Sequence, residues 1–519
     1  MAGRVDAQSL RAWIEDGQEL AILDAREEGE FGASHLFWAV PCPLSRAELR
    51  IPVLLPRLGT RIVCVDGGGG LAERLAQLLA AQGAADVHVL EGGTAAWAAA
   101  GHVLFSGVNV PSKAFGEWVE HHYGTESIDA AALKARQDAG ADLIVLDSRP
   151  MDEFVRMSIP GGINVPGGEL AYRIGDLVPD PATLIVVNCA GRTRSIMGAE
   201  SLRRAGVPNP VVALRNGTMG WELAGLAVEH GKTRRYVPGV PATAALALER
   251  GRAFAEEAGV GVIGPLDLAR YEEDPARTLY VLDVRDPAEF AARHRPGSRN
   301  APGGQLIQST DQWVAVRGAR VALVDDDGVR ARMAGAWLRL MGHRDVFVVE
   351  GGLDALDSTE AATVMLPKSP LPAVALTSDV EGAMVIDLAR SIDFRAGHIP
   401  GAAWGVRTRL DALRGRLGGA ARVVVTSPDG VLARLAVAEL AALTAVPVAA
   451  LEGGTAAWVA AGGTLAADRT DPPDEACIDF YLRAYDRNSG VEEAMKAYLS
   501  WEIGLVDEIG RDGSVRFGA

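Results

Sequence analysis

The sequence predicts an α/β protein of four tandem domains, each with a mainly parallel sheet flanked by helices, followed by a helical C-terminal tail. Three observations indicate this organisation. The chain has 519 residues, and domains of about 150 residues would divide such a length into three or four. Three landmarks recur four times in the same order. Within each copy, short apolar runs alternate with helical segments, which is typical of βαβ units.

The landmarks are an apolar strand ending in an acid, a junction between a strand and a loop, and a glycine turn closing on a large apolar residue. The acids are Asp24, Asp147, Asp283 and Asp387. The junctions are Asp66, Cys189, Asp325 and Ser427, and the turns close on Trp97, Trp221, Leu356 and Trp458. From the acid to the junction there are 42, 42, 42 and 40 residues in the four copies, and from the junction to the residue that closes the turn there are 31, 32, 31 and 31. Spacings this constant indicate four homologous domains.

These landmarks place the expected boundaries. We expect domains at residues 1–108, 126–235, 236–365 and 366–467, a helical connector at 109–125 and a helical tail at 468–519. Adjacent histidines in the connector, His121 and His122, point to different faces of a helix and would not share a metal, so a solvated connector is expected.

One face of the tail is apolar at helical spacing: Val491, Met495, Leu499, Ile503 and Val506. Such a face must pack on something, since apolar surface is unfavourable in water. Packing on the chain's own domains is the simpler expectation, and a homodimer formed through the tail is the alternative.

Composition excludes several classes of function. A net charge of -16 argues against a nucleic-acid surface. Apolar runs are too short to span a membrane, and residues 1–17 lack the apolar centre of a signal peptide, so we expect a cytoplasmic protein. The cysteines Cys42, Cys64, Cys189 and Cys477 fit neither a zinc pattern nor a disulfide framework. No metal or organic cofactor is expected.

Cys189 is the cysteine whose surroundings favour chemistry. It follows the apolar run "TLIVVN" and precedes the helical segment "SIMGAESLRRAG", at the end of a strand where α/β sheets bind ligands. Backbone N–H groups of such a loop converge at a helix N-terminus. Arg192 and Arg194 add positive charge, so the thiolate, which is the nucleophile, is favoured. Cys42 and Cys64 are expected to be buried apolar groups, and Cys477 shows no catalytic context.

The strand–Cys–loop–helix unit, "LDSRPMDEF" and "RNGTMGW" together resemble the rhodanese (thiosulfate sulfurtransferase) domain. Over residues 1–467 the resemblance is to bacterial proteins with four tandem rhodanese domains. It implies that Cys189 accepts a sulfane sulfur as a persulfide and passes it to a thiol or to cyanide. The implied cradle is Ala190, Gly191, Arg192, Thr193, Arg194 and Ser195. The implied partners are a small-molecule sulfur donor, thiosulfate or a small persulfide, and a thiol acceptor; the alternative is a module that relays sulfur between proteins.

Two departures from the family pattern matter. Many single-domain members read Cys-x-x-Gly-x-Arg-Ser, whereas here the glycine is Gly191, one place early, which leaves the identity of the donor open. Related phosphatases and arsenate reductases place arginine six residues after the cysteine. Here Arg194 comes at the fifth position and Ser195 at the sixth, so the loop favours sulfur transfer over those reactions.

The other three copies lack the cysteine. Asp66, Asp325 and Ser427 cannot carry a persulfide, and an aspartate would repel an anionic donor. Leu71 and Leu432 stand at the arginine position of copies one and four, and copy three alone retains an arginine, Arg330. We therefore expect one active domain and three scaffolds.

Four further residues of the active copy could support the site. Asp147 and Arg149 are expected to form a structural ion pair beneath the loop. Trp221 is expected to pack behind the cradle. Arg173 could reach the pocket mouth, although a solvated arginine is the expectation.

Overall fold

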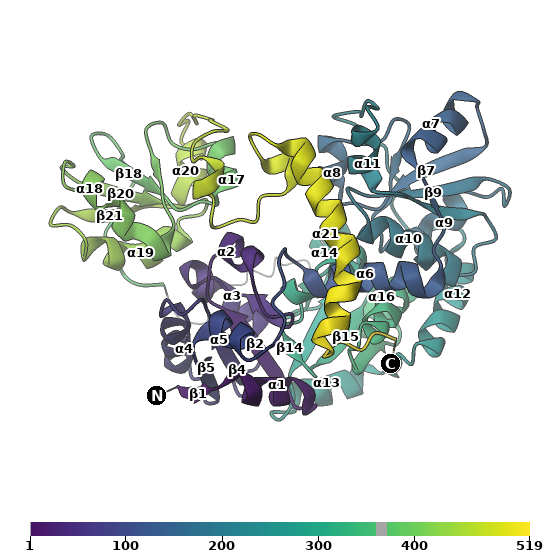
Figure 1. Cartoon of the computed structure of the whole chain (residues 1–519), viewed down its shortest axis with the longest axis horizontal. Helices are drawn as coiled ribbons and strands as arrows, with labels where there is room; N and C mark the ends of the chain where they lie inside the picture. Colours follow the sequence, from purple (N-terminus) through teal and green to yellow (C-terminus); the bar gives the residue numbers. More distant parts are fainter. Residues whose placement is uncertain (1, 360–370, 519) are drawn as a thin grey trace.

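The computed structural model of the chain describes residues 2–359 and 371–518, so the boundary expected at residues 365 and 366 lies outside the described residues. Four mainly parallel sheets follow one another along the chain, each flanked by helices (Figure 1). The predicted fold class is thereby confirmed. None of the helices in the described ranges combines the length and the apolarity that a membrane crossing requires.

The first two copies and the connector between them occupy the N-terminal half of the chain. Copy one contains β1 (Gly3–Val5), α1 (Ala7–Glu15), β2 (Leu20–Asp24), α2 (Glu28–Ala33), β3 (Ala39–Pro41), α3 (Ala47–Leu54), β4 (Arg61–Val65), α4 (Leu71–Ala81), β5 (Val87–Leu90) and α5 (Gly93–Ala99). The connector is α6 (Val110–Tyr123). Copy two contains β6 (Ser127–Ile128), α7 (Ala130–Asp138), β7 (Leu143–Asp147), α8 (Met151–Arg156), β8 (Ile163–Asn164), α9 (Leu170–Leu177), β9 (Leu184–Asn188), α10 (Thr193–Arg204), β10 (Val211–Leu214) and α11 (Gly217–Leu223).

The last two copies and the tail repeat the pattern. Copy three contains α12 (Ala244–Glu257), β11 (Gly261–Ile263), α13 (Pro265–Glu273), β12 (Leu279–Asp283), α14 (Pro287–Ala292), β13 (Arg299–Asn300), α15 (Gly303–Gln308), β14 (Val316–Arg317), β15 (Arg320–Val324), α16 (Val329–Leu340) and β16 (Asp345–Val349). Copy four contains β17 (Leu376–Thr377), β18 (Met384–Asp387), α17 (Ser391–Ala396), β19 (Ala403–Trp404), α18 (Arg414–Leu417), β20 (Val423–Thr426), α19 (Val431–Ala441), β21 (Val448–Leu451) and α20 (Gly454–Ala460). The tail ends in α21 (Val491–Asp512).

Strand order is the same in every copy. Copy two has the order β6-β10-β9-β7-β8, and copies three and four have β11-β16-β15-β12-β13 and β17-β21-β20-β18-β19. In copy one the order is β1-β5-β4-β2, with β3 and the antiparallel β14 of copy three both paired to β2. The sequence does not predict that β14 joins the sheet of copy one, because a two-residue strand has no detectable periodicity.

The constant spacing between the second and third landmarks has a direct physical cause. In copy two the backbone N–H of Thr218 donates to the carbonyl of Cys189 at 2.8 Å. Gly217, just before it, has φ +55°, and a Cβ there would lie 2.3 Å from that carbonyl oxygen. The glycine turns of the other copies, Gly93, Gly352 and Gly454, meet their own junction carbonyls in the same way. Each junction and turn therefore form one packed unit, which fixes the number of residues between them.

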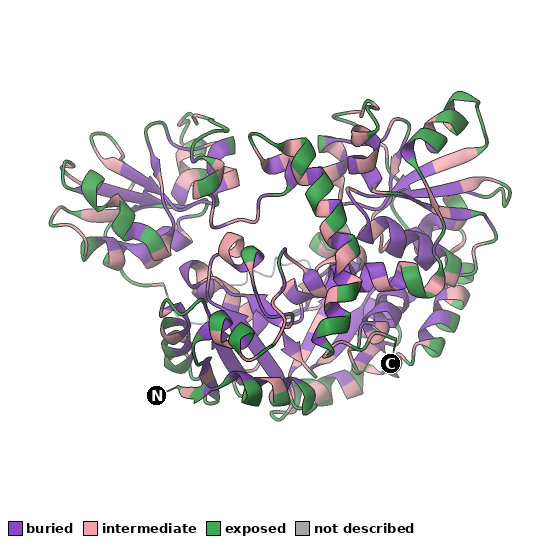
Figure 2. Cartoon of the chain, in the orientation of Figure 1, coloured by how far each residue is buried: buried purple, intermediate pink, exposed green. Residues whose placement is uncertain are grey.

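Copies one to three share one apolar core, while copy four has its own. The largest cluster of buried side chains includes Leu75 of copy one, Phe115 of the connector, Ile196 of copy two and Trp337 of copy three. Copy four meets copy one through polar contacts, such as Arg407 with Glu48 at 2.8 Å. Buried strands fill the interior of each domain and exposed residues line the outer helix faces (Figure 2).

The connector is not the solvated segment expected from the sequence. One face of α6 is buried against α10 and α21, including Val110, Phe115 and Glu117. His121 and His122 are exposed at its far end. The expectation failed because the two helices that cover α6, α10 of copy two and α21 of the tail, lie far away along the chain.

The tail packs on its own chain. Helix α21, yellow in Figure 1, packs across α6 beside copy two. Met495 and Leu499 are buried as predicted, but the prediction for Ile503 is wrong, because half of this residue is exposed. The buried face continues instead through Glu502 and Leu505. The apolar pattern of the tail could not predict that Glu502 is buried, because glutamate is not an apolar residue.

Candidate active site

The cradle loop, residues 189–195, joins the buried strand β9 to helix α10. Cys189 is 2% exposed, and its Sγ lies 3.6 Å from the Oγ of Ser195. The Ser195 hydroxyl donates to the carbonyl of Arg192 at 2.7 Å. The serine proton is thus engaged within the loop, and the sulfur faces the space that the loop encloses.

Free backbone donors surround this space. Within the described ranges, no acceptor pairs with the N–H groups of residues 190–194. Such a ring of N–H groups at a helix N-terminus attracts negative charge. The loop can therefore stabilise an anionic sulfur or an oxyanion beside Cys189.

In copies one and three the same ring is already filled. The Asp66 carboxylate accepts from the N–H groups of Gly68 and Leu71, both at 2.7 Å. Asp325 accepts from Gly328 at 2.7 Å and from Ala331 at 3.0 Å, and burial raises its pKa to about 6. From the sequence, the aspartates were expected only to repel an anionic donor. In the structure their carboxylates also occupy the N–H groups that an anion would bind.

A buried polar network supports the cradle loop from below. Asp147 accepts from Arg149 at 2.7 Å and from the Asn188 amide at 2.8 Å. Asn188 also donates to Thr218 at 3.2 Å, and the Thr218 hydroxyl donates to the Cys189 carbonyl at 3.0 Å. Asp147 and Arg149 thus lie beneath the loop as an ion pair, and the network joins β7, β9 and α11 to Cys189.

The two loop arginines are paired with carboxylates rather than free. Arg192 binds both carboxylate oxygens of Glu117 at 2.7 Å, and it also pairs with Glu120. Arg194 binds both oxygens of Glu153, at 2.7 and 2.8 Å. Burial alone would raise the pKa of Glu153, but the charge of Arg194 outweighs burial and lowers it to about 2. The sequence suggested net positive charge from both arginines, and the structure neutralises it.

Helix α21 covers the cradle loop and contacts it directly. The Thr193 hydroxyl donates to Glu502 at 2.8 Å, and Glu502 also pairs with Lys113 at 3.0 Å. Tyr498 donates to Glu502 at 2.9 Å, and its ring lies so near Gly191 that a Cβ there would come within 3.0 Å of it. Burial and the neighbouring Glu502 raise the pKa of Tyr498 well above its ordinary value. Glycine at 191, one place early in the family pattern, therefore makes room for the tail.

Cys189 opens into a cavity of about 150 Å³ whose walls come from four parts of the chain. Copy two contributes the cradle loop and α8, and the connector contributes Lys113. Copy three contributes Gln305 and Gln308 from α15. The tail contributes aromatic and charged side chains, Tyr481, Arg483, Tyr485, Asp486, Tyr498 and Trp501. The cavity at Cys189 is therefore built by several parts of the chain and not by copy two alone.

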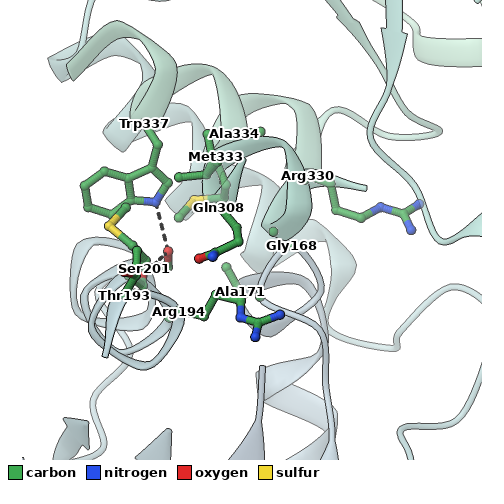
Figure 3. Close-up of a pocket in the computed structure, with 16 residues that line it drawn as sticks. Gly168, Ala171, Thr193, Arg194, Ser201, Gln308, Arg330, Met333, Ala334 and Trp337 are labelled. Atoms are coloured by element: carbon green, nitrogen blue, oxygen red, sulfur yellow. Dashed lines mark hydrogen bonds between the residues drawn. The ribbon is translucent and has the colours of Figure 1, made fainter. Parts of the chain in front are cut away.

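A second, smaller cavity of about 40 Å³ lies behind the loop, between α10 and α16 (Figure 3). Thr193 and Arg194 line one side of it, and Trp337 donates to Ser201 at 2.9 Å across it. Cys189 is not among its lining residues. We interpret it as a packing space between copies two and three.

Other predicted residues lie away from the sulfur. Trp221 is fully buried and donates to the Ala227 carbonyl at 2.8 Å. Arg173 is 3% exposed and pairs with Glu169 at 2.8 Å, so the expectation of a solvated arginine is wrong. It does not line the cavity at Cys189. The remaining cysteines, Cys42, Cys64 and Cys477, are buried elsewhere.

Sequence reasoning missed Asn188, Thr218, Glu117, Glu153 and the tail residues at the cavity. Asn188 carried a usable signal, since it is a polar residue ending an apolar strand. Glu117 and Glu153 carried none, because glutamates on helices are usually solvated. In the parts of the chain that the structure describes, no group of three or more His, Cys, Asp or Glu side chains is arranged to hold a metal ion.

Fold and site together define a class of protein: tandem α/β domains in which one copy carries a buried cysteine within a ring of backbone N–H groups. The chain matches the family model of the rhodanese-like domain over residues 6–100, 129–224 and 266–359, more than half of its length. It belongs to the rhodanese-like family. The fourth copy, outside these matches, has the same strand order.

Two relatives illustrate the resemblance. The crystal structure of a thiosulfate sulfurtransferase from Pseudomonas aeruginosa is 46% identical, with a TM-score of 0.94, and the match covers 100% of this chain and 99% of that one. An HTH-type transcriptional regulator of Mycobacterium tuberculosis is 30% identical over 228 residues, which cover 42% of this chain and 88% of that protein.

Proposed function

We propose that this chain is a sulfurtransferase in which Cys189 carries the sulfur as a persulfide. The observation that carries the proposal is the buried Cys189 sulfur, which opens into a cavity and is ringed by N–H groups without acceptors. The similarity along the full chain to a thiosulfate sulfurtransferase supports it. Thiosulfate or a small persulfide would be the donor.

In the first half-reaction, the Cys189 thiolate attacks the outer sulfur of thiosulfate. A bond forms between the two sulfurs, the S–S bond within thiosulfate breaks, and sulfite leaves with the electron pair. The persulfide that remains on Cys189 carries one negative charge. The free N–H groups of residues 190–194 would stabilise this charge, as preorganised dipoles do in other anion sites.

In the second half-reaction, an acceptor thiolate or cyanide attacks the outer sulfur, and Cys189 leaves as the thiolate. The persulfide would lie beneath the tail, in a cavity of about 150 Å³. Enclosure of this kind favours a small acceptor over a cysteine on a protein surface. A protein-to-protein relay would require the tail to move away from the cradle loop.

Steady-state kinetics would test both halves of this proposal. We expect the chain to release sulfite from thiosulfate only when a small thiol or cyanide is present. This activity should be lost in Cys189→Ser. The matched control is Cys64→Ser, a cysteine buried at the corresponding strand of copy one. Turnover that survives in Cys189→Ser would refute the proposal. A thiol-bearing protein that outcompetes a small thiol as acceptor would favour the relay.

A further inference from the structure

Six cationic side chains line the cavity at Cys189, and five of them have a carboxylate partner. The pairs are Lys113 with Glu502, Arg149 with Asp147, Arg156 with Asp486, Arg192 with Glu117 and Arg194 with Glu153. The sixth is Arg483, which makes no ion pair with any of the described residues. The positive charge that remains for an incoming anion therefore comes from the tail rather than from the cradle loop.

The segment that follows Arg483 is anchored to copy two, which limits where the exposed Arg483 side chain can reach. Arg156 binds Asp486 at 2.9 Å and the Tyr485 carbonyl at 2.6 Å. The Tyr485 hydroxyl donates to Glu222 at 2.6 Å. Arg483 is exposed, and it lines the same cavity as the buried Cys189. After burial and Arg194, Arg483 is a further influence on the low pKa of Glu153, so its charge is felt inside the cavity.

We propose that Arg483 recognises the oxyanion end of the sulfur donor while the donor's outer sulfur meets Cys189. This inference rests on the proposed function for its choice of donor, a thiosulfate-like dianion. A planar guanidinium is suited to bind two oxygens of a sulfonate-like group at once. The N–H groups of the cradle loop would hold the sulfur that is transferred, and Arg483 would hold the group that leaves as sulfite.

This role places donor specificity outside the repeated domains. The rhodanese-like matches end at residue 359, and Arg483 lies on the tail. The cradle loop would supply dipoles for the sulfur that Cys189 carries, whereas Arg483 would supply a full charge from the cavity wall. Removal of Arg483 should weaken binding of anions and leave the reactivity of Cys189 toward neutral reagents unchanged.

A pair of alkylating reagents tests this charge dependence without requiring turnover. Iodoacetate and iodoacetamide are similar in size and alkylate thiolates by the same displacement, but only iodoacetate is anionic. We would measure alkylation of Cys189 by peptide mapping in the full chain, in Arg483→Gln and in Arg483→Lys. Arg469→Gln is the matched control, since Arg469 is an exposed arginine of the same tail that does not line the cavity.

We expect the iodoacetate-to-iodoacetamide rate ratio to fall about three- to tenfold in Arg483→Gln at low salt, as for loss of one partly solvated ionic contact. It should recover in part in Arg483→Lys and stay unchanged in Arg469→Gln. Salt should shrink the difference, since exposed charges are screened. The KM for thiosulfate should rise by a similar factor with kcat nearly unchanged.

A ratio in Arg483→Gln equal to that of the parent would overturn the inference. So would an equal loss of reactivity toward both reagents, because Arg483 would then only position the tail. If the ratio falls but thiosulfate yields no sulfite, anion recognition by Arg483 stands and the proposed sulfur transfer fails. The two proposals are thus judged by separate readouts.

Discussion

Arg192 was expected to add positive charge beside Cys189, but in the structure its charge is paired with a carboxylate. Its guanidinium binds both oxygens of Glu117, whose side chain is fully buried on α6. A buried carboxylate needs a partner, because removal of its counterion leaves an uncompensated charge in a poorly solvated site. Arg192 therefore holds the connector against the cradle loop, and its effect on the sulfur is indirect.

The first prediction concerns the contribution of this ion pair to stability. Arg192→Ala should lower the local free energy of unfolding of α6 by about 3–5 kcal/mol, since it leaves Glu117 buried and unpaired. The double variant Arg192→Gln with Glu117→Gln should lose less, because no charge is left unpaired. Hydrogen exchange of the α6 amides measures this free energy. Arg203→Ala, which removes a half-exposed partner of Glu200, is the control.

A double variant as unstable as Arg192→Ala would contradict this account of the pair. Equal protection of α6 in all variants would show instead that apolar contacts of Phe115 and its neighbours hold the connector.

At the scale of elements, the glycine turn before α11 sets the position of the cradle loop. Gly217 lies against the carbonyls of Cys189 and Gly191, and a Cβ would come within 2.3 and 2.6 Å of their oxygens. No side chain can enter this contact unless the loop moves. The contact between the turn and the loop thus fixes the position of the cradle loop, and it also accounts for the constant spacing in the sequence.

Gly217→Ala is therefore expected to displace the loop and to reduce sulfur transfer at least tenfold, with strain of about 1–3 kcal/mol from the left-handed backbone in addition. Gly225→Ala is the matched control, because Gly225 also has a positive φ, +75°, but faces open space. Rates of sulfite release and thermal unfolding of both variants provide the comparison. If Gly225→Ala loses as much activity as Gly217→Ala, backbone strain rather than contact with the loop is responsible.

For the whole molecule, one cavity is built mainly by two of the four copies, the connector and the tail. Copy two supplies Cys189, copy three supplies Gln305 and Gln308, and the connector and the tail complete the walls. In copies one and three, Asp66 and Asp325 fill their own cradles. Under the proposed function, one copy performs the chemistry and the other copies support it.

This organisation also explains what the sequence could predict. The four copies and Cys189 were predictable, because they depend on contacts that recur at fixed spacing within each copy. The pairing of Thr193 with Glu502 joins residues 309 positions apart, and nothing in either segment indicates the other. Ion pairs such as Arg194 with Glu153 were equally hidden, since local sequence does not reveal which charges are buried together.

The most direct test of the account is the mass of the intact chain after incubation with thiosulfate. The account predicts a gain of one sulfur atom per chain, located at Cys189 by peptide mapping, and no gain in Cys189→Ser. Brief treatment with cyanide should remove the added sulfur. A sulfur atom found on Cys42, Cys64 or Cys477, or continued turnover of thiosulfate with no sulfur on Cys189, would contradict the claim that one cysteine carries the reaction.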